Sequence, residues 1–175
     1  MISSLKEGIK NNNDIKDASD NLYLKFSRND IRIELRDSGN RSMFDLGSFS
    51  PNTLGKKMLT EIAAWLSSIP ENISVIGYTD RVPYRMGKGW SMSNWTLSTL
   101  RADHAREILV QAGYPDGHIL DVSGRADRDL AVADDPTSPA NRRIVIVIHR
   151  RYVSPDEEGK QSLTPSESNK SSEKK

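Results

Sequence analysis

The sequence predicts an α/β sandwich, also describable as α+β, in which helices pack on one mixed β-sheet. Segments with strand periodicity alternate with two long segments of helical periodicity, which suit crossover connections. Residues 144–148 form a continuous β-branched run, typical of a strand buried on both faces. The expected order is β-α-β-α-β-loop-β.

The first predicted strand covers residues 31–36, where apolar and charged residues alternate. Ser50 and Pro51 then give an N-cap followed by proline at the first helical position, so we expect a helix from there to Pro70. Apolar residues follow at helical spacing: Leu54, Met58, Ile62, Trp65, Leu66 and Ile69.

The second half of the core repeats this alternation. Residues 73–78 have little polar character and predict a central strand. A loop rich in Gly and Pro follows, and a second helix is expected over residues 94–112, ended by Gly113. Residues 118–123 predict another strand, and a polar loop leads to the final strand at 144–148.

The 175 residues predict one domain with polar ends. The core is expected at residues 21–152. Residues 1–20, rich in Asn, Asp and Lys, are expected to form a polar linker with room for a short amphipathic helix. Residues 153–175 contain too little apolar surface to offset the entropy of ordering, so this tail is expected to be disordered.

Composition excludes several classes of function. Twenty-five basic and 24 acidic residues give a net charge of +1, which calls for no nucleic acid and no anionic membrane. There is no cysteine, and the three histidines have no metal-ligand spacing. No nucleophile, phosphate-loop or zinc-protease motif is present, so neither catalysis nor a cofactor or metal is expected. No apolar run could span a bilayer, and the first ten residues lack the core of a signal peptide.

Asp80 is the first candidate for a site, because it follows a central strand at its carboxyl end, where ligands tend to gather in such sheets. Capping of a turn is the competing interpretation. Arg101 lies on the apolar stripe of the second helix, and a buried charge there needs a partner. Asp80 and Arg101 are therefore expected to form either a binding site or an internal salt bridge, and residue types alone leave both open.

Two further groups carry the same ambiguity. Ser93 and Asn94 can cap the second helix, or its free N–H groups can receive a carboxylate. Asn141, Arg142 and Arg143 place two guanidinium groups at the entrance of the last strand, and for an Arg-Arg pair alone a solvated strand entrance is the favoured interpretation.

These residues form an ordered series that resembles the OmpA-like peptidoglycan-binding domain. The strand end Gly77-Tyr78-Thr79-Asp80, the helix start Asn94-Trp95-Thr96-Leu97-Ser98 continuing to Arg101, and Asn141-Arg142-Arg143 are similar to the family's G-H-T-D, N-x-x-L-S-x-x-R-A and N-R-R motifs. The match covers about residues 43–150. Tyr78 stands where the family usually has His.

The resemblance implies a ligand, the diaminopimelate of the wall peptide, and roles for single residues. The position of Asp80 would take the ammonium group and that of Arg101 the carboxylate. Asn94 and Leu97 would line the pocket and Arg142 would border it. The implied ligand-binding set is completed by Thr79, Tyr78 and Asn141.

Within the family, the Ser93-Asn94-Trp95 stretch and the Asp80-Arg81-Val82-Pro83 stretch are similar to the MotB branch. That resemblance implies a periplasmic domain of a single-pass inner-membrane stator subunit, with its membrane helix upstream of Met1. Peptidoglycan, a MotA-like membrane subunit and a second copy of the chain would be its partners. Tyr78 and Asp129 point to a divergent branch, such as the MotB-like subunit of a type I secretion system for a giant adhesin.

Two functional hypotheses follow. The first is a non-catalytic wall anchor of a proton-driven, stator-like complex. The second is an interaction or structural domain that has lost wall binding and serves a motor or secretion complex. An enzyme is not expected, because the candidate site opposes one carboxylate to an arginine rather than pairing an acid with a base.

Overall fold

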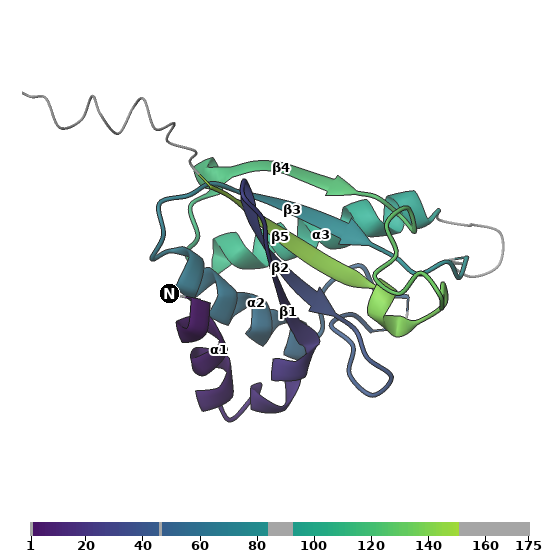
Figure 1. The fold of residues 1–175 in the computed structure, drawn as a ribbon, viewed down its shortest axis with the longest axis horizontal. Helices are drawn as coiled ribbons and strands as arrows, with labels where there is room; N and C mark the ends of the chain where they lie inside the picture. Colours follow the sequence, from purple (N-terminus) through teal and green to yellow (C-terminus); the bar gives the residue numbers. More distant parts are fainter. Residues whose placement is uncertain (1, 46, 84–92, 151–175) are drawn as a thin grey trace, which may run out of the picture.

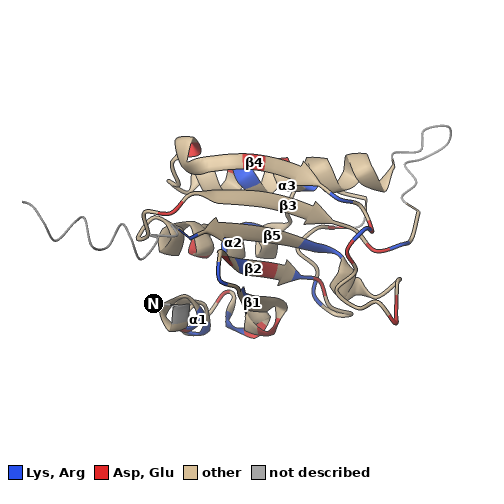
Figure 2. Ribbon diagram, turned by 45° about the horizontal axis from the view of Figure 1, so that its top comes forward, with Lys and Arg blue, Asp and Glu red and all other residues tan. Residues whose placement is uncertain are grey.

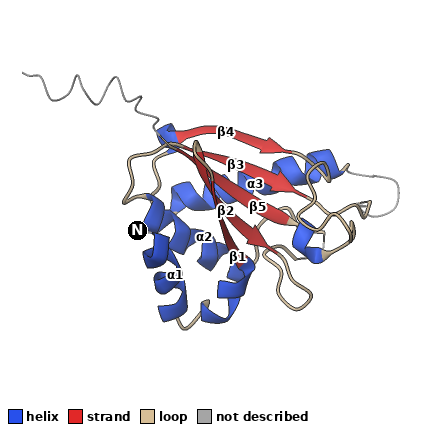
Figure 3. Cartoon of the chain, viewed as in Figure 1, coloured by secondary structure: helices blue, strands red, loops and turns tan. Residues whose placement is uncertain are grey.

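The computed structural model describes residues 2–45, 47–83 and 93–150. Three α-helices and five strands form two layers, with short 3₁₀ turns between them (Figures 1 and 3). In chain order the helices and strands are α1 (Ile2–Asn11), β1 (Leu22–Phe26), β2 (Asp30–Arg36), α2 (Thr53–Leu66), β3 (Ile73–Tyr78), α3 (Asn94–Gln111), β4 (Ile119–Gly124) and β5 (Arg143–His149). The predicted sandwich of helices on one mixed sheet is confirmed.

The strand order in the sheet is β1-β2-β5-β3-β4. The last strand, β5, lies in the centre and pairs antiparallel with both β2 and β3, while β3 and β4 are parallel and joined through α3. Strands β2 and β3 therefore end at the edge of the sheet where β5 begins. Six of the seven residues of β5 are buried, as the β-branched run predicts.

Helices α2 and α3 cover one face of the sheet, behind it in Figure 1. Helix α3 approaches the strands closely because glycines face it: a Cβ on Gly77 would lie 2.0 Å from the Ser98 carbonyl oxygen. On Gly124 a Cβ would lie 2.3 Å from the Thr99 backbone nitrogen. The predicted cap of this helix is confirmed, since Ser93 Oγ accepts a hydrogen bond from Thr96 N–H.

Helix α2 begins two residues later than the sequence suggested. Its N-cap is Asn52, whose Oδ1 accepts from Gly55 N–H at 2.9 Å, rather than Ser50. Ser50 instead contacts the Nδ1 of His104 at 3.0 Å. The helix ends at Leu66, before the predicted stop at Pro70.

The N-terminal segment packs on the domain, which corrects the expected linker over residues 1–20. Leu5 and Ile9 of α1 are buried, and so are Ile15 and Ala18 around the following 3₁₀ turn. These side chains join the main core, and α1 contacts α2. The few apolar residues of the segment are thus enough to attach it. The expected tail at 153–175 lies outside the described residues.

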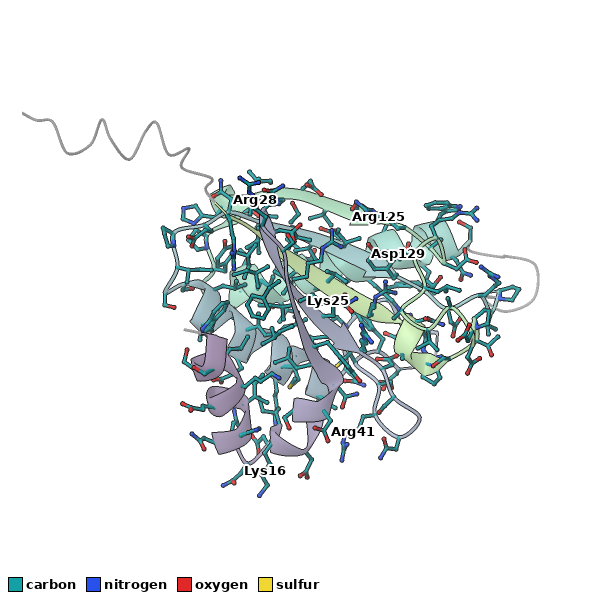
Figure 4. All side chains as sticks on the ribbon, in the orientation of Figure 1. Lys16, Lys25, Arg28, Arg41, Arg125 and Asp129 are labelled. Atoms are coloured by element: carbon teal, nitrogen blue, oxygen red, sulfur yellow. The ribbon has the colours of Figure 1, made fainter. Side chains whose placement is uncertain are left out.

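Strand β1 is an addition to the predicted order. It pairs antiparallel with β2 at the edge of the sheet, Leu24 opposite Ile33. On the face away from the helices, the buried Glu34 is paired with Lys25, Arg36 and Arg143. Arg125 lies on this same face, where its Nη1 donates to the Tyr78 hydroxyl at 3.4 Å; Figure 4 labels Lys25 and Arg125. In the described part of the chain, no helix is long and apolar enough to cross a membrane.

Candidate functional site

A pocket opens at the edge where β2 and β3 end and β5 begins, beside the start of α3. Charged segments of both signs gather there (Figure 2). The cavity has a volume of about 520 Å³. Its described lining comprises Asp37, Ser42, Phe44, Asp45, Gly47, Thr79, Asp80, Val82, Pro83, Asn94, Leu97, Arg101, Thr137 and Arg142.

Asp80 lies in this pocket with a side chain that is only 8% exposed. Its Oδ1 accepts a hydrogen bond from Val82 N–H at 3.0 Å, so the residue does cap the turn after β3. Its Oδ2 accepts from Arg142 Nη1 at 2.8 Å. A buried carboxylate with two such donors is held in one orientation.

Arg142 links Asp80 to a second buried carboxylate, Asp37. Its Nε donates to Asp37 Oδ2 at 3.2 Å while its Nη1 reaches Asp80. Burial lowers the pKa of Arg142, but the hydrogen bonds and charges of Asp80 and Asp37 outweigh it and raise that pKa above its ordinary value. The described ion pair of Asp80 is with Arg142.

Arg101 is buried, as its place on the helix stripe predicts, and lines the same pocket. Its Nε donates to the Ser48 carbonyl oxygen at 3.1 Å, and its guanidinium carbon lies 4.8 Å from the centre of the Phe44 ring. The loop after β2 thus forms a wall that supports Arg101 by a hydrogen bond and a cation–π contact.

Thr79, Asn94 and Leu97 complete the predicted lining. The Asn94 amide donates to Val82 O at 3.1 Å. Thr79 Oγ1 and Asn94 Oδ1 are buried with no hydrogen-bond partner among the described residues. Buried polar atoms without a partner are uncommon and expensive, and both of these belong to residues that line the cavity.

Two implied ligand-binding residues lie outside the lining. Tyr78 points to the opposite face of the sheet, because strand side chains alternate and Gly77 faces α3. There its ring lies 4.0 Å from the guanidinium carbon of Arg143. Asn141 is fully buried and accepts from Val132 N–H while donating to Asp135 O, so it holds the preceding loop. Tyr78 in place of His therefore leaves the pocket's lining unchanged.

The pocket contains residues that the sequence did not point to. Asp37, Phe44 and Asp45 come from the end of β2 and the loop after it. Only Asp37 had a signal in the sequence, since it follows a predicted strand directly, as Asp80 does. The described residues contain no group of His, Asp and Glu that could hold a metal ion.

The sequence also matches a known protein family. The model of the OmpA family matches residues 43–143, more than half of the chain. The chain belongs to the OmpA family. This segment runs from the loop after β2 to the first residue of β5, so the family match contains most of the pocket.

Several of the sequence relatives are flagellar proteins of the MotB-like branch of this family. LafU of Escherichia coli O44:H18, named a flagellar export/assembly protein, is 36% identical over 134 residues. These are 77% of this chain and 43% of LafU. Motility protein B of Escherichia coli K12 is 37% identical over 128 residues, 73% of this chain and 41% of the relative. The chain thus spans less than half the length of these relatives.

Further likenesses extend beyond the flagellar proteins. The peptidoglycan-associated lipoprotein of Rhizobium meliloti is 30% identical over 112 residues, 63% of this chain and 60% of the lipoprotein. A MotB-like protein from Desulfovibrio vulgaris has the same fold with a TM-score of 0.69 at 19% identity, covering 86% of this chain and 92% of its own. The cell wall anchor of the type VI secretion system of Pseudomonas aeruginosa gives 0.65 at 23% identity, covering 84% and 97%.

Proposed function

We propose that this chain binds peptidoglycan without catalysis, through the diaminopimelate of its stem peptide, and anchors a MotB-like inner-membrane stator subunit to the cell wall. The observation that carries the proposal is the composition of the pocket. Carboxylates and guanidinium groups, all held in place by hydrogen bonds, surround one cavity. The far end of diaminopimelate carries an ammonium group and a carboxylate on one carbon, so both signs are needed to bind it.

In this proposal Asp80 receives the ammonium group, with Thr79 Oγ1 and Asn94 Oδ1 as further acceptors. An ammonium group has three N–H donors, and these two oxygens lack partners among the described residues. Arg101 receives the carboxylate, and Leu97 contacts the aliphatic carbons between the charged end and the rest of the peptide. Each charge-assisted hydrogen bond contributes about 1.5–3 kcal/mol.

Such a site suits a polymer. A single stem peptide needs only modest affinity, because many identical peptides on one sacculus raise the effective concentration of ligand. The relatives named after the wall, a peptidoglycan-associated lipoprotein and a cell wall anchor, support this proposal. The flagellar relatives support the stator context, with a periplasmic location and a MotA-like subunit and second copy as partners. The secretion-system context stays a prediction.

One observation favours the second hypothesis, a domain that has lost wall binding. Arg142 already neutralises Asp80, so the two could form a structural ion pair rather than half of a binding site. The two hypotheses differ in what the removal of Asp80 does. A structural pair predicts a loss of stability and no binding to lose, whereas a binding site predicts a loss of binding by a chain that still folds.

Co-sedimentation with purified sacculi separates them. The chain is expected to pellet with sacculi that contain diaminopimelate, and Asp80→Ala is expected to stay in the supernatant while its circular dichroism spectrum shows a folded protein. Sacculi with lysine at the same position lack the second carboxylate and should retain less protein. Equal pelleting of wild type and variant, or none of either, would refute the assigned site. Release of soluble muropeptides during the incubation would instead indicate an enzyme.

A further inference from the structure

Asp37 is a buried carboxylate directly after β2. One of its oxygens contacts Arg142, and the other contacts the loop that follows β2. We propose that Asp37 is a positioning residue, which holds Arg142 across the pocket so that Arg142 meets Asp80 and presents its remaining N–H donors to the carboxylate of the ligand. The inference rests on the proposed function for the identity of the ligand. The positioning of Arg142 by Asp37 concerns the unliganded protein and does not depend on which ligand binds.

The contacts of Arg142 give the first step. Its guanidinium group has five N–H donors, of which Asp37 takes Nε–H and Asp80 takes one Nη1–H. The side chain is 32% exposed, so a guanidinium tied only to Asp80 could turn toward water. Two carboxylates on opposite sides fix its plane, because the planar fork can bond to both at once. Arg142 lines the pocket, and in this proposal its remaining donors meet the ligand there.

The other oxygen of Asp37 gives the second step. Oδ1 accepts from Met43 N–H at 2.8 Å, in the loop that follows β2. The next residue is Phe44, whose ring lies under Arg101, and Ser48 of the same loop accepts from Arg101 Nε. One carboxylate therefore connects Arg142 to the wall that supports Arg101, the proposed partner of the ligand's carboxylate.

The cost of burying this charge favours a functional role over a structural one. The side chain of Asp37 is 4% exposed, and burial raises its pKa despite the opposing hydrogen bonds from Met43 and Arg142 and the positive charge of Arg101. A raised pKa means that the folded state binds the proton more tightly than the unfolded state. The ionised form therefore lowers stability above that pKa, and a neutral side chain of the same shape is tolerated at pH 7.

Asp37→Asn tests the inference, because it keeps an oxygen for Met43 N–H and removes the charge that holds Arg142. We expect Kd for a stem tripeptide containing diaminopimelate to rise at least tenfold in calorimetric titration, with no fall in the melting temperature at pH 7. Arg142→Lys should weaken binding similarly, since an ammonium group cannot bridge both carboxylates. The double variant should bind no more weakly than Arg142→Lys alone. Asp30→Asn, at the other end of β2, is the matched control.

A crystal structure of unliganded Asp37→Asn supplies a readout that needs no ligand. We expect the contact of 2.8 Å between Arg142 Nη1 and Asp80 Oδ2 to be lost. If Arg142 keeps this contact, or if the effects of the two single variants on Kd multiply, Asp37 does not act through Arg142 and the inference fails. If Arg142 moves but the wild-type chain does not bind the tripeptide, the positioning role stands and the proposed function fails.

Discussion

Replacing Asp80 with Asn changes one charge in the pocket and almost nothing in its shape. The amide oxygen can still accept from Val82 N–H, so the turn after β3 is retained. The ligand's ammonium group loses a charge-assisted hydrogen bond of about 1.5–3 kcal/mol. Kd for a stem tripeptide containing diaminopimelate should therefore rise about 10- to 150-fold.

Stability should change far less. The partner of Asp80, Arg142, is 32% exposed and keeps its hydrogen bond to Asp37 after the substitution. A partly solvated pair of this kind contributes about 0.2–1 kcal/mol, and that is the expected loss in the free energy of unfolding.

The assay is isothermal titration of both proteins at pH 7, with urea unfolding measured on the same samples. Asp121→Asn, on the opposite face of the sheet, controls for a general effect of removing a carboxylate. A change in Kd below about threefold, together with a loss of stability above about 2 kcal/mol, would show that the pair is structural and that the reasoning is wrong.

Three further predictions concern the framework of the site. In Gly77→Ala the new Cβ would meet the Ser98 carbonyl oxygen at 2.0 Å, so α3 must move and urea unfolding should show a loss of about 1–3 kcal/mol or more. Asn141→Ala leaves buried loop groups without partners; calorimetry should show about 1–3 kcal/mol of destabilisation, and affinity for the tripeptide should fall less than in Asp80→Asn. Burial raises the pKa of Glu34, but its hydrogen bond with Arg36 and the neighbouring basic charges lower it below 4.5. The ionised Glu34 carboxylate therefore stabilises the fold at pH values above its lowered pKa. Glu34→Gln should lower the melting temperature at pH 7 and leave it unchanged below that pKa.

Each of these three predictions would be contradicted by a specific result. Gly39 has open space around it, and Gly39→Ala should leave stability within about 0.5 kcal/mol; equal losses at Gly39 and Gly77 would refute the close approach of α3. An Asn141→Ala variant as weak in binding as Asp80→Asn would place Asn141 in the binding machinery. A melting difference for Glu34→Gln that is the same at acid and neutral pH would show that its charge contributes nothing.

The parts of the fold that the sequence predicts well are those whose signals are local. The buried run of β5 is recognisable without knowledge of its neighbours. The start of α3 is equally local, because Ser93 caps it within one turn. The close contact of α3 with Gly77 and Gly124 is not local, because it depends on how α3 packs on β3 and β4.

The elements that the sequence left out or placed in a linker depend on tertiary contacts. Strand β1 reads Leu-Tyr-Leu-Lys-Phe, and its exposed Tyr23 and Phe26 blur the alternation that would identify a strand with one buried face. The first helix is polar on average, and only the spacing of Leu5 and Ile9 marks the side that packs toward α2. Composition over twenty residues hides so narrow an apolar stripe.

The residues of the site also differ in how well the sequence alone predicts them. Asp80, Arg101 and Arg142 could be predicted from their places in motifs, and they do meet at one pocket. Asp37 follows a predicted strand, but its role could not be predicted, because that role depends on a contact with Arg142, more than a hundred positions away. Tyr78 shows the limit of carrying over a motif: strand alternation already required it to face away from Gly77 and α3.

The central claim is that a zwitterionic wall peptide binds between Asp80 and Arg101, and the most direct test is an NMR titration of the labelled chain with a stem tripeptide containing diaminopimelate. The account predicts shifts confined to the pocket, strongest at Thr79, Asp80 and Asn94, which saturate in the wild type and disappear in Asp80→Ala. Shifts on the opposite face of the sheet, around Tyr78, or no shifts at millimolar peptide, would contradict it.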